Sequence, residues 1–169
     1  MKLRYSIALS LPLASASAMA ADLALKLDVP QLNVAEYHRP YIAAWVENAD
    51  QKVVANLAVL YDVKKKDNVG TKWLKDMRTW WRKTGRELTM PMDGVSGATR
   101  APGETTLNIP KGALDKLPAG QYTVLVEASR EAGGREVVKV PLQWPPQSAQ
   151  NVTGKGKEEL GAVVVQVKP

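Results

Sequence analysis

The sequence of 169 residues contains no cysteine and a single histidine, His38. The absence of cysteine excludes disulfides, thiolate metal sites, cysteine nucleophiles and iron–sulfur clusters. Because no other soft ligand accompanies His38, we assign no metal site. The chain also shows no Ser-His-Asp order, no glycine-rich Walker loop and no paired-carboxylate motif. We therefore do not expect the protein to be an enzyme on its own.

Beyond residue 20, the sequence has no apolar run long enough to cross a bilayer. At its start, two basic residues precede a short apolar stretch, Tyr5–Leu13, which is followed by Ala18-Met19-Ala20. This order is typical of a cleaved secretory signal peptide. We therefore predict a signal peptide over residues 1–20 and cleavage before Ala21. The mature chain is expected to be a periplasmic protein, peripheral to the membrane at most.

Positive charge is concentrated in one segment of the chain. The sequence has 23 basic and 17 acidic residues, and removing Lys2 and Arg4 with the signal peptide leaves a net charge of +4. Residues 63–86 alone hold nine basic and two acidic residues, a net charge of +7. This segment is either a solvated helix face or a surface that attracts a phosphate, an acidic redox partner or a membrane. Because the protein is predicted to be exported, nucleic acid is a poor candidate for the partner of this segment.

Most of the mature chain shows the period-two alternation of β-strands. The hairpin between residues 40 and 61 turns at Asn48–Lys52, and a second hairpin turns at Ala132-Gly133-Gly134. About seven short strands with turn signals between them predict an all-β fold, an immunoglobulin-like antiparallel β-sandwich. We expect one domain over residues 21–169, with a polar and flexible segment at 146–159. The predicted strands cover 21–29, 40–46, 53–61, 105–109, 122–128, 138–144 and 162–167.

The period changes from two to that of a helix at Lys72. Five apolar residues then fall on one stripe of an α-helix, and Gly85 is a plausible stop. The sequence therefore predicts one inserted amphipathic helix of about three turns. Its stripe either packs on the core or offers an aromatic face to a ligand. The stripe consists of Trp73, Leu74, Met77, Trp80 and Trp81.

A loop rich in Met, Pro, Gly and Ser, residues 89–103, carries the most specific motif of the chain. Its segment Asp93-x-x-Ser96-Gly97-Ala98-Thr99 resembles the acceptor sequence of flavin transferases. That sequence is found in the covalently flavinylated subunits of sodium-pumping quinone reductases and related electron-transfer complexes. The resemblance implies that Thr99 carries FMN through a phosphodiester bond made by a separate, exported transferase.

The residue types of the motif suit that chemistry. The acceptor Thr99 must be exposed on flexible backbone, and Gly97 and Ala98 let that backbone enter a narrow cleft. Arg100 is the expected phosphate contact, and Asp93 is expected to orient the loop or bind a cation. Trp80 or Trp81 would cover the flavin ring by stacking, unless both belong to the core. The other interpretation of the motif is a plain loop in which Asp93 and Ser96 make turn hydrogen bonds.

Four segments together resemble the predicted periplasmic proteins catalogued as domain of unknown function 2271. The resemblance covers most of residues 22–145 and implies association with flavin transferases and with PepSY-type membrane redox proteins. The family has no established activity. The segments are Arg39–Glu47, Trp73-x-x-Asp76-x-Arg78-x-Trp80-Trp81, Ser96-Gly97-Ala98-Thr99-Arg100-x-Pro102-Gly103, and Ala119-Gly120-x-Tyr122 through Glu127-Ala128-x-Arg130-Glu131.

Two hypotheses of different kinds follow from these observations. The first is an exported electron carrier with FMN esterified to Thr99, which exchanges electrons with a membrane redox protein. The second is a binding module without a cofactor, because sandwich domains commonly bind partners through their loops. The two differ in whether Thr99 acquires FMN when a transferase is present.

Overall fold

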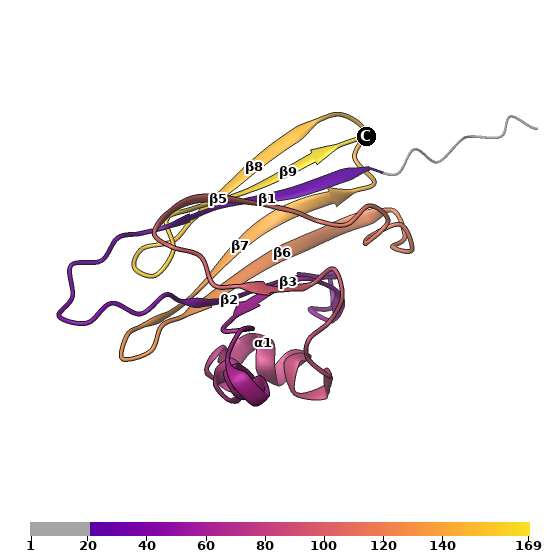
Figure 1. The fold of residues 1–169 in the computed structure, drawn as a ribbon. Helices are drawn as coiled ribbons and strands as arrows, with labels where there is room; N and C mark the ends of the chain where they lie inside the picture. The colour runs from indigo at the N-terminus through magenta and orange to yellow at the C-terminus, as the bar shows by residue number, and fades with distance from the viewer. Residues whose placement is uncertain (1–20) are drawn as a thin grey trace, which may run out of the picture.

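The computed structural model describes residues 21–169, so the predicted signal peptide lies outside the described residues. Two β-sheets pack face to face, and short helices cover the outer face of one of them (Figure 1). One sheet has the strand order β5-β1-β9-β8, and the other has the order β4-β3-β2-β6-β7. The β-sandwich that the sequence predicts is therefore confirmed.

Nine strands and three short helical segments make up the described chain. The four-stranded sheet contains β1 (Asp22–Val29), β5 (Gly103–Asn108), β8 (Gln150–Lys155) and β9 (Ala162–Lys168). The five-stranded sheet contains β2 (Tyr41–Glu47), β3 (Val53–Tyr61), β4 (Ser96–Ala98), β6 (Gly120–Ser129) and β7 (Arg135–Trp144). The helical segments are the 3-10 helices η1 (Lys66–Asp76) and η2 (Gly85–Glu87), and the α-helix α1 (Arg78–Lys83).

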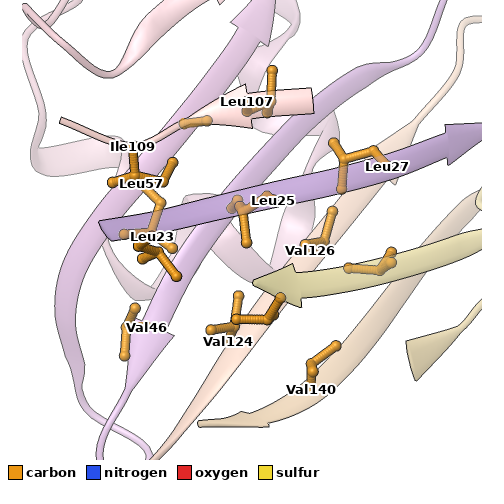
Figure 2. Packing of buried hydrophobic residues seen from close by; sticks show 14 of the residues in the cluster. Leu23, Leu25, Leu27, Val46, Leu57, Leu107, Ile109, Val124, Val126 and Val140 are labelled. Carbon is orange, nitrogen blue, oxygen red and sulfur yellow. The ribbon is translucent and has the colours of Figure 1, made fainter. Parts of the chain in front are cut away.

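The main core fills the space between the two sheets. Alternate residues of β1 point inward, and they meet inward-facing residues of β6 and β7 (Figure 2). Complete burial of each such Leu or Val side chain stabilises the fold by about 1.5–3 kcal/mol. The facing residues shown in Figure 2 include Leu23, Leu25, Leu27, Val124, Val126 and Val140.

A second core lies between the five-stranded sheet and the helical layer. It contains Leu74, Met77 and Trp80, three members of the predicted stripe, packed on Trp45 and Tyr61 of the sheet. The prediction of a single three-turn α-helix was wrong, however. Met77 has a ψ of 72°, which interrupts the helix and leaves a 3-10 segment before it and six α-helical residues after it. Three of the five stripe residues are therefore buried against the sheet, whereas Trp73 and Trp81 are half-buried and line surface hollows.

Two strands occur where the sequence predicts none. Strand β4 lies within the predicted loop 89–103 and pairs in parallel with β3. Strand β8 lies within the segment 146–159 predicted as flexible, and it pairs with β9 at the edge of the four-stranded sheet. Both strands are short edge strands, which need no apolar face of their own. Each forms because its backbone hydrogen-bonds to a neighbouring strand, and the local pattern of apolar residues does not predict such pairing.

The buried Glu159 and the half-buried Glu136 tie the β6–β7 hairpin to the chain between β8 and β9. Glu159 accepts hydrogen bonds from Arg130 Nε at 2.9 Å and from the backbone N–H of Gly134 at 2.7 Å. Glu136 accepts four backbone N–H bonds, from residues 157–160, at 2.6–3.1 Å. Burial alone would raise the pKa of Glu136, but these four donors lower it below its ordinary value of 4.5. The charged form of Glu136 is therefore the one that the fold stabilises.

This lowered pKa predicts a pH dependence of stability. The contribution of Glu136 is complete above its unfolded-state pKa and is lost as the pH falls through its lower folded-state pKa. We expect Glu136→Gln to be less stable than the wild type at neutral pH. The two urea unfolding midpoints should then converge as the pH is lowered from about 6 to about 3. Two midpoint curves that stay parallel over this range would contradict the role of Glu136.

Candidate functional site

Thr99 directly follows β4, at the end of the sandwich where β2 begins and β3 ends. The parallel pairing aligns Ser96, Gly97 and Ala98 with Val59, Leu60 and Tyr61 of β3. A Cβ atom on Gly97 would lie 3.0 Å from Leu60 Cδ2, so glycine at this position lets β4 approach its neighbour. Ser96 Oγ accepts a hydrogen bond from Met92 N at 2.8 Å, which closes the loop before the strand. Ser96, Gly97 and Ala98 of the motif therefore belong to the sheet, and Thr99 is half-buried directly after the last paired residue, which differs from the expected exposed and flexible loop.

Two adjoining hollows of about 310 and 330 Å³ meet at Thr99. Both are lined by Thr99, Arg39, Asp62 and Lys65, and we call the pair of hollows the Thr99 cleft. The residues that line the cleft come from five separate parts of the chain. They are the β1–β2 connection with the start of β2, the end of β3 with the turn after it, η1, the end of β4, and the end of β6 with the β6–β7 turn. Figure 1 shows that the β1–β2 connection and the β6–β7 turn project from the same end of the sandwich.

One side of the Thr99 cleft is rich in positive charge. The hollow of about 330 Å³ is lined by Arg39, Lys64 and Lys65, with Asp62 as its one carboxylate. Lys65 Nζ lies 3.3 Å from that carboxylate. This half of the cleft therefore carries a net charge of +2 beside the Thr99 hydroxyl, which favours an anion there.

The other side of the cleft is aromatic. The hollow of about 310 Å³ is lined by Tyr37, Tyr41 and Trp73, and Lys65 Nζ lies 4.3 Å from the centre of the Trp73 ring. Tyr41 donates a hydrogen bond to the carbonyl of Gly70 at 3.1 Å. Burial raises the pKa of Tyr41 to about 12, so its phenol stays neutral at physiological pH. This half of the cleft offers a planar group an aromatic wall and a neutral hydroxyl.

Carboxylates also line the aromatic hollow. Asp76 and Glu131 both line it, and His38 lies between Glu36 at 3.1 Å and Glu131 at 3.7 Å. Within residues 21–169, no group of three or more His, Cys, Asp and Glu side chains is arranged to hold a metal ion. No helix in this part of the chain is long and apolar enough to span a membrane. The aromatic hollow is thus lined by Asp62, Asp76 and Glu131 against Arg39 and Lys65, so it lacks the positive excess of the other hollow.

A family model described as "Predicted periplasmic protein (DUF2271)" matches residues 22–162. The chain belongs to this family. The match includes every element of the Thr99 cleft. Comparison with the curated proteins and with the solved structures gave no match. The protein is thus a periplasmic protein whose family has no assigned catalytic activity.

Neither tryptophan predicted to cover a flavin lines the Thr99 cleft of this DUF2271 protein. Trp80 is completely buried in the second core, where its indole Nε1 donates to Asn56 Oδ1 at 2.9 Å, so its ring has no free face. Trp81 is half-buried and lines a separate hollow beside Lys75 and Arg135. The aromatic residue of the stripe that does reach the cleft is Trp73.

The charged residues of the motif also lie apart from the cleft. Arg100 lines a third hollow at the open edge between β4 and β5, where its Nε is buried without a hydrogen-bond partner. Asp93 is exposed in the loop before β4. The cations that line the cleft with Thr99 are Arg39, Lys64 and Lys65. Both lysines belong to the basic segment 63–86, for which phosphate attraction was one interpretation, whereas Arg39 was not predicted as a site residue. The sequence shows that these cations lie just before β2 and just after β3. Only the pairing of β4 with β3 brings those two strand ends next to Thr99.

Proposed function

We propose that this periplasmic protein is an electron carrier with FMN esterified to Thr99. One observation carries the proposal. The acceptor residue of the flavin-transferase motif lies where a cationic hollow meets an aromatic hollow. FMN has the same two parts, an anionic phosphate and a planar aromatic ring, joined by a flexible ribityl chain.

The cationic hollow fits the phosphate. A phosphodiester on Thr99 keeps one negative charge, and Arg39, Lys64 and Lys65 lie in the same hollow. Arginine pairs well with phosphate oxygens, while the two lysines act as point charges. These residues, in place of the predicted Arg100, would hold the phosphate.

The aromatic hollow fits the ring. Trp73 presents a half-buried indole, and aromatic pairs of this kind contribute about 0.5–1.5 kcal/mol beyond area burial. Tyr41 adds a phenol that stays neutral, so it places no charge against the ring. When bound, FMN supplies reversible transfer of one or two electrons. Trp73 and Tyr41 would orient the ring and keep part of it out of water.

The covalent bond would be made by a flavin transferase acting on FAD. The Thr99 Oγ would attack the phosphorus of the FMN half, the bond between the two phosphates would break, and AMP would leave. The hydroxyl proton would pass to a base of the transferase, because threonine is a weak nucleophile without one. A PepSY-type membrane redox protein is the proposed electron partner.

Intact mass spectrometry tests this function. The protein, with its signal peptide, is co-expressed with an exported flavin transferase and purified from the periplasm. We expect the mass to rise by one FMN residue, and flavin absorbance to stay with the chain after denaturation. An unchanged mass, in cells where a known acceptor protein is modified by the same transferase, would overturn the proposal and favour a module without a cofactor.

A further inference from the structure

A separate hollow of about 350 Å³ lies on the helical layer and is lined by four cations around one tryptophan. Lys75 comes from η1, and Arg78, Trp81 and Arg82 come from α1. The fourth cation, Arg135, comes from β7. We call this surface the basic hollow. It shares no lining residue with the Thr99 cleft.

Three of these cations have no carboxylate near them. Among the ion pairs of residues 21–169, none within 4.0 Å involves Lys75, Arg78 or Arg82. Arg82 Nε instead donates to the backbone carbonyl of Arg78 at 3.1 Å. None of these three charges is therefore paired with a carboxylate at ion-pair distance.

The fourth cation is fixed in place by a buried carboxylate. Arg135 Nη1 donates to Glu127 Oε1 at 2.9 Å and lies 3.3 Å from Thr79 Oγ1. Glu127 is completely buried beneath α1, so it holds Arg135 but presents no negative surface to the hollow. The hollow thus carries four positive charges against one buried negative charge.

This arrangement differs from an ordinary solvated helix face. Such a face usually alternates its charges at spacings of three and four residues, whereas α1 has no acidic residue at all. The convergence of a cation from β7 with three from the helical layer adds repulsion that an anionic ligand would relieve. The half-buried Trp81 adds an apolar surface at the same place.

We propose that the basic hollow docks an acidic peptide segment of a protein partner. Several separated carboxylates match several separated cations, whereas one small anion would leave most of them unpaired. Arginine and tryptophan are also the residues enriched at the energetic centres of protein interfaces. This inference does not depend on FMN and stands whether or not Thr99 is modified.

A lipid surface is the less favoured occupant. Interfacial binding combines basic residues with apolar side chains that enter the bilayer. Among residues 21–169, the exposed large hydrophobic side chain is Val34, which belongs to the β1–β2 connection and does not line the basic hollow. Trp81 is half-buried in the lining of the hollow and does not project from the surface. These features favour a peptide that enters a concave site.

The experiment measures fluorescence anisotropy of a labelled oligoglutamate peptide at low salt. We expect saturable binding by the wild type that weakens as salt rises, because salt screens these charges. The double variant Arg78→Glu/Arg82→Glu should weaken binding by about tenfold or more, since it places like charges against the peptide. The single variant Lys75→Glu, outside α1, should also weaken it. Circular dichroism verifies that each variant is folded.

A matched charge reversal controls for net charge. Lys116→Glu/Lys155→Glu changes two exposed lysines outside the helical layer and alters the net charge by the same amount. It should leave peptide affinity within about twofold of the wild type, because charges more than a Debye length away are screened. Equal weakening by the two double variants, or no binding of the peptide, would overturn the proposal. The proposal would also be overturned if the protein bound phosphatidylglycerol vesicles but not the peptide, and if Arg78→Glu/Arg82→Glu abolished the vesicle binding.

Discussion

Thr99→Ala should carry no covalent FMN when it is co-expressed with a competent transferase, while the wild type is modified. The substitution removes the only oxygen through which the phosphodiester can form at this position. It should have little effect on folding, because Thr99 is half-buried and lies beyond the paired residues of β4. Intact mass, peptide mapping and flavin absorbance after denaturation measure the outcome.

The conservative variant Thr99→Ser keeps the hydroxyl group but removes the methyl group of Thr99. It therefore separates the need for a hydroxyl from any effect of side-chain packing. Serine keeps a hydroxyl group on the same backbone and should accept FMN, with a change in yield but not in position. Ser96 provides a second comparison, because its hydroxyl is engaged with Met92 N at 2.8 Å and should not be an acceptor. FMN found on Ser96, or FMN retained by Thr99→Ala, would show that the attachment site is wrong.

Glu127→Ala should destabilise the protein more than any surface substitution in the helical layer. Glu127 is completely buried and accepts the backbone N–H groups of Thr79 at 3.1 Å and Trp80 at 2.7 Å. It also accepts from Arg135. Its removal leaves backbone donors beneath α1 without partners and breaks the ion pair with the partly exposed Arg135, so we expect a loss of about 2–5 kcal/mol in the free energy of unfolding. Urea denaturation measures this loss.

Glu87→Ala is the matched control for that prediction. Its carboxylate also belongs to the helical layer, but its side chain is 76% exposed and its pairing with Arg86 is 3.8 Å long. Such exposed pairs contribute about 1 kcal/mol or less, so its unfolding midpoint should change little. If Glu127→Ala unfolds no more easily than Glu87→Ala, then Glu127 does not anchor α1 to the sheet.

Much of the sandwich could be predicted because its strands repeat a burial pattern that the sequence shows directly. Leu23, Leu25 and Leu27 alternate in the sequence and all point into the core. The β6–β7 hairpin was also visible, since its two faces and its turn are local features. In contrast, β4 contains three small residues with no apolar alternation, so only its pairing with β3 identifies it as a strand.

The helical stripe shows how far local periodicity extends. It correctly places Leu74, Met77 and Trp80 against the sheet, yet it did not reveal the break at Met77. Trp73, which precedes the break, lines the Thr99 cleft, and Trp81, which follows it, lines the basic hollow. Apolar periodicity predicts which face of a helix is buried, but it does not predict which part of the protein packs against each residue of that face.

The motif that ends at Thr99 was determined by the sequence, as were the excess of charge in residues 63–86 and the alternation of the main strands. The tertiary structure decided which side chains surround Thr99. Arg39 and Lys65 precede and follow a hairpin that is distant from the motif in sequence, and β4 meets that hairpin only through parallel pairing. Contacts of this kind depend on which strands become neighbours. Strand order is fixed by burial across the whole sandwich, which no local pattern of residues contains.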